Sequence, residues 1–146
     1  PPPLPPLSPQ QQVHADYRAA GLSLRGHPLA FVRAELDALG AIQAAQLADW
    51  PTDRPVRIAG LVLMRQRPGT AKGITFVTLE DETGSANLIV HPRVWKRCEL
   101  AARRATALLV TGRVERKERV IHVIASRLED MAERLQELRH RSRDFR

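Results

Sequence analysis

The chain has 146 residues, with 23 Lys and Arg against 16 Asp and Glu, a formal charge of +7 and only 4% aromatic residues. This length allows one or at most two small domains. No run of 18 apolar residues occurs, so the sequence predicts no membrane-spanning helix. A single cysteine, Cys98, excludes an internal disulfide and a thiolate metal cluster, and it fits a reducing compartment.

The positive charge is concentrated in the middle of the chain. Residues 55–126 hold 13 basic and 6 acidic side chains, net +7, whereas residues 1–54 carry a net charge of −1 and residues 127–146 of +1. A basic excess of this size attracts polyanions, because each neutralised phosphate releases condensed counterions. Charge alone leaves a second interpretation open, in which the excess only keeps the domain soluble.

The N-terminal third is predicted to be a linker followed by a helical connector. Residues 1–12 are rich in proline and begin without a methionine, so they predict an extended linker within a longer protein. Residues 13–54 are predicted to form the connector. Its clearest element is an amphipathic helix over 28–39, with Pro28 at its start and Gly40 just past its end. A shorter helix is predicted over 41–48, and the turn-rich stretch 50–54 predicts a domain boundary.

From residue 55 the apolar period changes to that of β-strands. Alternation predicts strands over 56–62, 74–80, 86–90, 108–115 and 120–125, and apolar spacings of three and four predict a helix over 92–104. Three strands, a helix and two strands are the order of an OB-fold. The predicted fold is therefore mainly β: a five-strand OB-fold barrel over 55–126, preceded by the helical and linker segment and followed over 127–146 by a C-terminal helix, predicted at 128–138, and a tail.

The loops after the first and fourth predicted strands are both basic. In an OB-fold these two loops flank the ligand face of strands two and three. The first loop is predicted to carry Arg65, Arg67 and Lys72, and the second Arg116, Lys117 and Arg119. Together they predict a cationic rim for a single-stranded nucleic acid.

The second strand is predicted to carry a stacking platform. If Val77 and Leu79 point into the barrel, Phe76 and Thr78 point outward, because side chains alternate across a strand. An outward Phe76 stacks a base; with the opposite parity it is buried. Asn87 on the third strand shares the outward parity and is interpreted either as a base-edge contact or as a cap of the hairpin. The predicted nucleic-acid contacts are Arg57, Arg65, Arg67, Lys72, Phe76, Thr78, Asn87, Arg113, Arg116 and Lys117. With so few aromatic residues in the strands, we expect modest, salt-dependent affinity.

No catalytic group is predicted within these 146 residues. The acidic run Glu80-Asp81-Glu82 lies beside Thr83-Gly84 and is interpreted as a tight turn rather than a metal site. The five histidines lack the spacing of a zinc site, and the sequence has neither a P-loop nor a nucleophilic Ser elbow.

Three segments of the sequence resemble a known family. They are Val56-Arg57-Ile58-Ala59-Gly60-Leu61-Val62, Arg65-Gln66-Arg67-Pro68-Gly69-Thr70-Ala71-Lys72-Gly73 and Phe76-Val77-Thr78-Leu79-Glu80-Asp81-Glu82-Thr83-Gly84. In this order they resemble the C-terminal OB domain of bacterial C-family DNA polymerases of the alpha-subunit type. The upstream segment Gly21-Leu22-Ser23-Leu24-Arg25-Gly26-His27-Pro28-Leu29 is similar to the segment that follows the helix-hairpin-helix region in that family. The short ending after residue 126, together with the loop at 67–73, resembles the error-prone branch, which lacks the tau-binding domain.

The resemblance implies the function of the parent protein. A C-family error-prone polymerase adds deoxynucleotides past lesions in the bacterial cytoplasm by two-metal, Mg²⁺-dependent phosphoryl transfer, with carboxylates that lie outside this segment. No cofactor is therefore expected in the 146 residues. The implied partners are single-stranded template DNA and proteins of the mutagenesis complex, namely an inactive Y-family-like subunit and a RecA-like accessory protein.

Two other functions stay open. In the first, the barrel groove or the C-terminal helix docks a partner protein, although the apolar stripe of that helix at Leu128, Met131, Leu135 and Leu138 is more simply core packing. In the second, the barrel binds tRNA anticodons, since the Leu79-Glu80-Asp81 hairpin also resembles aminoacyl-tRNA synthetases.

Overall fold

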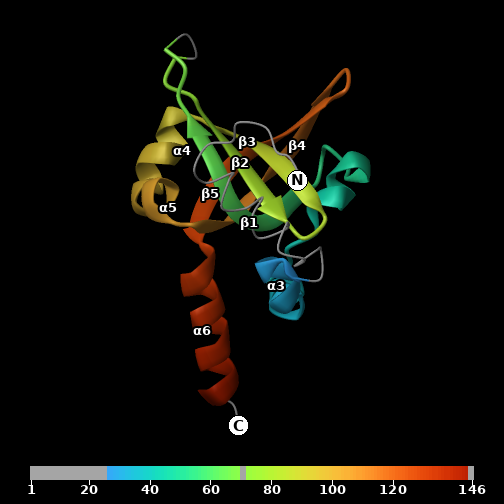
Figure 1. Cartoon of the computed structure of the whole chain (residues 1–146). Coiled ribbons are helices and arrows are strands. Elements are labelled where there is room, and N and C mark those ends of the chain that lie inside the picture. The colour runs from blue at the N-terminus through green and yellow to red at the C-terminus, as the bar shows by residue number, and fades with distance from the viewer. Residues whose placement is uncertain (1–25, 70–71, 145–146) are drawn as a thin grey trace.

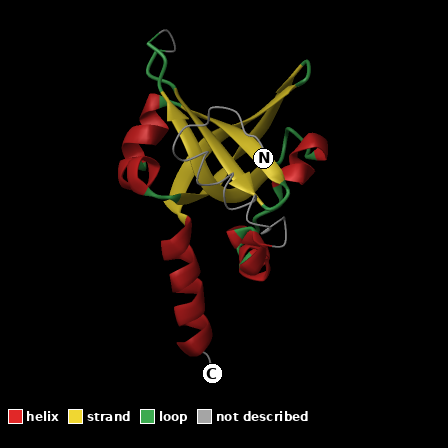
Figure 2. Ribbon diagram, viewed as in Figure 1, coloured by secondary structure: helices red, strands yellow, loops and turns green. Residues whose placement is uncertain are grey.

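A computed structural model describes residues 26–69 and 72–144. In this part of the chain the strands form one barrel and the helices lie outside it (Figures 1 and 2). The elements are, in chain order, α2 (Pro28–Phe31), α3 (Arg33–Ala38), the 3₁₀ helix η3 (Ala44–Asp49), β1 (Pro55–Gln66), β2 (Thr75–Asp81), β3 (Gly84–Val90), α4 (Pro92–Arg97), α5 (Glu99–Arg104), β4 (Ala107–Lys117), β5 (Val120–Asp130) and α6 (Met131–Asp144). The predicted linker over 1–12 and the first part of the predicted connector lie outside the described residues.

The five strands close in the order β1-β2-β3-β5-β4. Strands β1 and β4 are antiparallel, as are the sequential pairs β1–β2, β2–β3 and β4–β5, while β3 and β5 run parallel through the pair Leu88–Val123. Closure leaves no exposed sheet edge. The predicted class, a mainly β OB-fold barrel with flanking helices, is confirmed.

The barrel interior follows the alternation of the sequence. Val56, Ile58 and Val62 point inward and are almost fully buried. Gly60 of β1 faces β2 where no side chain fits, since a Cβ at this position would lie 2.8 Å from the Leu79 Cβ. The internal glycine thus permits close strand approach, while the irregularity in β1 falls at Val62–Met64.

A second apolar cluster lies outside the barrel. The outer surface of β1 and β4 presents Ala59, Ala107 and Leu109, which we call the covered face, and α2, α3 and α6 bury it. Met131 and Leu135 supply the contribution of α6. The interpretation of the predicted stripe as core packing is confirmed for Met131 and Leu135, while Leu128 lies in β5 within the barrel core and Leu138 is half-buried. Figure 1 shows α3 beside the first turns of α6, below the barrel.

The two predicted connecting helices are each interrupted. The helix over 28–39 breaks at Val32, which has φ −115° and ψ 13°, and the helix over 92–104 breaks at Cys98, with φ −111° and ψ 24°. Each break redirects the chain so that residues on both sides reach an apolar cluster. The helix predicted over 41–48 is the 3₁₀ helix η3, preceded by a bridge between Ile42 and Ile58. None of the helices in the described ranges combines the length and apolar character needed to cross a membrane.

Three strands continue two or more residues past their predicted C-terminal ends. β1 continues to Gln66 and β4 to Lys117, so Arg65, Arg116 and Lys117 lie at strand ends rather than in loops. β5 continues to Asp130, because a bulge at Thr111–Gly112 restores its pairing with β4. The barrel therefore extends beyond residue 126, and α6 begins at Met131 rather than at residue 128.

Candidate nucleic-acid interface

The outer surface of β2 and β3 carries Phe76, Thr78 and Asn87, which we call the open face. Val77 and Leu79 are buried in the barrel, while Phe76 and Thr78 are partly exposed and Asn87 is exposed. Thr78 pairs with Asn87 across the two strands. The predicted parity is thus confirmed, whereas the roles of these residues in binding stay predictions.

A hydrogen bond orients Asn87 on the open face. The Thr78 hydroxyl donates to the Asn87 Oδ1 at 3.2 Å. This bond uses the carbonyl oxygen of the amide, and no described residue accepts from its Nδ2 group. The remaining donor is therefore available to an acceptor on a base edge.

The open face is closed at the end nearest the β2–β3 turn. Glu80 has the same outward parity as Thr78, yet it is only 8% exposed. The His27 Nε2 lies 3.4 Å from its Oε1, at the start of α2. The surface left for a ligand is therefore the half nearest the β1–β2 loop.

At the β1–β2 loop, two predicted contacts have different surroundings. The Arg67 guanidinium lies 5.0 Å from the centre of the Trp95 ring, and its Nε donates to the Thr75 Oγ1 at 3.0 Å. Lys72 is exposed in the turn that leads into β2, with φ 54°. Arg67 is thus held against α4, while Lys72 projects into solvent.

Arg65 anchors helix α5. Its Nε and Nη2 donate to the carbonyls of Ala102 and Ala105, at 2.7 and 2.6 Å. Burial lowers the pKa of the Arg65 guanidinium below its ordinary value. Since helix ends leave carbonyls without an intrahelical donor, this guanidinium completes the end of α5.

Arg57 and Arg116 make similar anchors for the connector. Arg57 Nη1 donates to the Leu39 carbonyl at 2.7 Å, on the β1–β4 side of the barrel away from the open face. Arg116 Nη2 donates to the carbonyls of Leu47 and Trp50 at 2.8 and 2.5 Å. The structure therefore does not bring Arg57, Arg65 and Arg116 together as free charges.

The β4–β5 hairpin keeps exposed charge. Arg113, Lys117 and Arg119 are exposed, and none forms an ion pair with another described residue. Figure 1 shows this hairpin and the β1–β2 loop projecting from the same end of the barrel. The exposed basic residues thus lie on two sides of that end.

The acidic turn between β2 and β3 fastens the connector. Arg33 Nε and Nη2 donate to the two Glu82 carboxylate oxygens at 2.7 and 2.8 Å, and Gln43 Nε2 donates to Oε2 at 3.2 Å. Burial of the Glu82 carboxyl opposes its ionisation, but the bonds from Arg33, the backbone and Gln43 outweigh it and lower the pKa of Glu82 to about 2. The Asp81 carboxylate accepts from the Ala44, Thr83 and Gly84 backbone N–H groups.

These carboxylates do not fit a Mg²⁺ ion. Their oxygens face guanidinium, amide and N–H donors, which a cation would have to displace. Within residues 26–69 and 72–144, no group of three or more His, Cys, Asp or Glu residues could hold a metal ion. The interpretation of the acidic run as a turn is confirmed by its hydrogen bonds.

Sequence reasoning missed the partners of these groups. Arg33 and Glu82 are 49 residues apart, and no local spacing connects them. Sequence reasoning gave Trp95 no role, although the Arg67 guanidinium lies over its ring. Trp95 lies about one helical turn after Pro92 and between Arg93 and Lys96. That position is the sequence signal of an aromatic side chain on a helix beside the β1–β2 loop.

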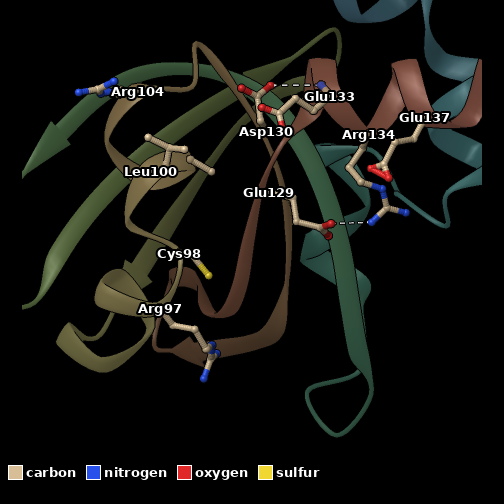
Figure 3. A pocket seen from close by; sticks show the side chains of 10 residues that line it. Arg97, Cys98, Leu100, Arg104, Glu129, Asp130, Glu133, Arg134 and Glu137 are labelled. Carbon is tan, nitrogen blue, oxygen red and sulfur yellow. Dashed lines mark hydrogen bonds and ion pairs between the residues drawn. The ribbon is translucent and has the colours of Figure 1, made fainter.

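A groove lies between α5 and the start of α6, with a volume of about 440 Å³. Figure 3 shows Leu100 on one wall and Glu133 and Glu137 on the other, with Glu129 paired to Arg134 below them. This groove is separate from the open face.

The closed barrel, its polar outer face and the exposed basic hairpin define a class of protein: the chain belongs to the family of OB-fold nucleic acid binding domains, which matches residues 56–131. The relatives it resembles are more specific. It is 52% identical over 141 residues to an error-prone DNA polymerase of Rhodopirellula baltica, covering 97% of this chain and 12% of that protein. It is 49% identical over 140 residues to the error-prone DNA polymerase of Caulobacter vibrioides, covering 93% of this chain and 13% of that protein.

These relatives confirm the resemblance to error-prone C-family polymerases, and the chain spans only about an eighth of their length. Among solved structures, asparaginyl-tRNA synthetase from Pyrococcus horikoshii matches 53% of this chain and 20% of that chain, with 27% identity and a TM-score of 0.45.

Proposed function

We propose that this chain is the OB-fold module of an error-prone DNA polymerase and that its open face contacts single-stranded template DNA. The observation that carries the proposal is Phe76, directed outward beside the Thr78–Asn87 pair, with Lys72 on one side and the β4–β5 hairpin on the other. An aromatic ring stacks any base, and basic loops attract the phosphates. The relatives named error-prone DNA polymerases support the polymerase context.

In this proposal the module serves an enzyme whose chemistry lies elsewhere. The parent extends a primer past damaged template bases in the bacterial cytoplasm, and Mg²⁺ supplies its phosphoryl-transfer chemistry at carboxylates outside this segment. The residues described for this chain hold the template strand in place and take no part in that step.

The affinity expected for such a face is modest. One aromatic side chain contributes roughly 1–3 kcal/mol through stacking. Several of the arginines that the sequence assigned to the rim are used as internal anchors, so the remaining attraction comes from a smaller number of exposed charges. Binding should therefore weaken steeply with salt.

The test is a fluorescence-anisotropy titration of the 146-residue chain with oligo-dT over a salt series. We expect Phe76→Ala to weaken binding about tenfold or more, because base stacking is lost. The matched control is Phe31→Ala on α2, which removes a phenylalanine that is 74% exposed and belongs to neither strand of the open face. If Phe76→Ala and Phe31→Ala bind alike, the open face is not the DNA site.

The same titration separates the competing functions. If tRNA displaces oligo-dT when added at a concentration equal to that of the oligonucleotide, the chain is an anticodon binder. A chain that binds no oligo-dT at low salt favours protein docking to the Y-family-like or RecA-like proteins of the mutagenesis complex. For docking through α6, only its exposed side remains, because Met131 and Leu135 are buried.

A further inference from the structure

Helices α4 and α5 are fixed directly beside the β1–β2 loop. Arg65 at the end of β1 holds the last turn of α5, and Arg67 lies over Trp95 of α4. At the other side of the loop, a Cβ on Gly73 would lie 3.0 Å from the Pro92 Cγ, so the loop returns against the first residue of α4. The surface of α4 is therefore continuous with the loop that flanks the open face.

This pair of helices carries a concentrated positive charge. Residues 92–104 include five basic side chains and one acidic one. Two of the five are engaged, since Arg97 donates to the Ser126 carbonyl and Arg103 pairs with Glu99 at 3.2 Å. Arg93 and Lys96 are exposed, and no described residue accepts a hydrogen bond from either side chain.

Arg93 and Lys96 lie on one side of α4. They are three residues apart, a spacing that places side chains on the same helix face one turn apart. Arg93 follows Pro92, which contacts the loop at Gly73, and Lys72 is exposed in that same loop. Lys72, Arg93 and Lys96 thus extend from the loop onto α4, and none of them forms an ion pair with another described residue.

The opposite border of the helical pair is acidic. The groove between α5 and α6 is lined on the α6 side by Glu129, Asp130, Glu133 and Glu137 (Figure 3). Arg134 pairs with Glu129, and Asp130 accepts from the Ala132 N–H at 2.9 Å, whereas neither Glu133 nor Glu137 forms an ion pair with another described residue. Arg97, Arg104 and Arg134 also line this groove, whereas Arg93 and Lys96 do not, so the cations of α4 lie outside it.

We propose that Arg93 and Lys96, with Lys72, form a second phosphate-contact site for single-stranded DNA that continues past the β1–β2 loop onto α4. This inference rests on the proposed function of the open face. A short strand reaches only the open face, whereas a longer strand also places phosphates on α4. The site adds affinity without sequence preference, because its contacts are to phosphates.

The experiment compares two double variants by anisotropy, with oligo-dT of about 6 nucleotides, near the short end of the roughly 4–16 that one OB-fold spans, and of about 20, beyond that range. Arg93→Gln/Lys96→Gln removes two charges from the proposed site. Arg103→Gln/Arg104→Gln removes two exposed charges from α5 and is the matched control. Thermal unfolding monitors the fold of both.

For Arg93→Gln/Lys96→Gln we expect roughly tenfold weaker binding of the long strand at low salt and a salt slope smaller by about 1.4, since each phosphate on a single strand contributes about 0.7. Binding of the short strand should be unchanged, and the control should bind both strands like the unmodified chain. If the two variants bind the long strand equally while the unmodified chain binds both strands, the α4 site is wrong and the open-face function stands. If the unmodified chain binds neither strand, both proposals fail.

Discussion

The barrel has two outer faces built from the same alternation of side chains, and they differ in what covers them. On β1 and β4 the outward positions are Ala59, Ala107 and Leu109, and three helices bury them. On β2 and β3 the outward positions hold Thr78, Asn87 and the lone aromatic Phe76, which stay partly or fully exposed. Small apolar side chains let a helix approach and gain from burial, whereas polar ones would lose hydrogen bonds to water.

The outward residues of a strand thus determine whether a barrel face is buried by helices or stays exposed. The covered face should respond to mutation through stability and the open face through affinity. Single and double substitutions on the two faces separate a loss of stability from a loss of affinity.

Leu109→Ala should destabilise the chain by about 2–5 kcal/mol, because it leaves a cavity between the barrel and the helices. Urea denaturation measures this loss. In the same assay Phe76→Ala should cost much less, since its ring is partly exposed. A loss below about 1 kcal/mol for Leu109→Ala would show that the covered face is not a packed core.

Glu82→Gln should reduce stability by about 2 kcal/mol at neutral pH, allowing for partial solvent screening of its pair with Arg33. The folded-state pKa of Glu82 is about 2, below the ordinary 4.5. Its contribution is therefore present above about pH 4.5 and is lost as the pH falls toward 2. Urea denaturation of both chains between pH 7 and 2.5 should show the difference disappear.

The control for this measurement is Glu137→Gln, an exposed glutamate on α6. Glu137→Gln should show the same pH dependence of stability as the unmodified chain. If Glu82→Gln loses stability in acid as steeply as the unmodified chain, the ion pair of Glu82 with Arg33 does not account for the acid sensitivity.

Lys117→Gln/Arg119→Gln should weaken oligo-dT binding about fivefold at low salt and reduce the salt slope by about 1.4, because two exposed charges on the β4–β5 hairpin are lost. Arg127→Gln/Arg141→Gln is the control: it removes one exposed charge near the far end of β5, away from the hairpin tip, and one on α6. Equal effects of the two variants would mean that net charge, and not the hairpin, governs binding.

Asn87→Ala should weaken binding about threefold, the effect of one neutral hydrogen bond to a base edge. The effect should vanish with an abasic strand of the same length, which offers no base edge. Ser85→Ala, at a neighbouring exposed position of β3, is the control. A loss that persists on the abasic strand would assign Asn87 to the backbone or to the fold.

Much of the barrel is predictable from the sequence because strand alternation is a local signal. The inward set Val56, Ile58 and Val62 and the outward Phe76 follow from a period of two. Strand ends are less predictable. Arg65 and Lys117 are charged residues that the sequence assigns to loops. Pairing with a partner strand extends β1 and β4 to include them.

The sequence predicts which strand surface carries the candidate site, but it does not predict which of the nearby arginines remain free of contacts within the fold. Arg116 reaches carbonyls 69 and 66 residues away in the chain, and Arg65 reaches carbonyls 37 and 40 residues away. No spacing rule connects such residues. A long guanidinium with several donors is drawn to whichever carbonyls the fold leaves without partners.

Local alternation and composition predict the chain order of the strands, the grouping of Phe76 and Thr78 on one side of β2, and the segment that carries the excess positive charge. They leave open whether that side faces inward or outward. The tertiary structure settles this parity and shows which of those charges remain available to a ligand. Arg57, Arg65 and Arg116 complete the ends of helices and the connector, while Arg93, Lys96 and Lys117 stay exposed. The physical reason is that buried carbonyls must find donors, and the arginines nearest in space, not in sequence, supply them.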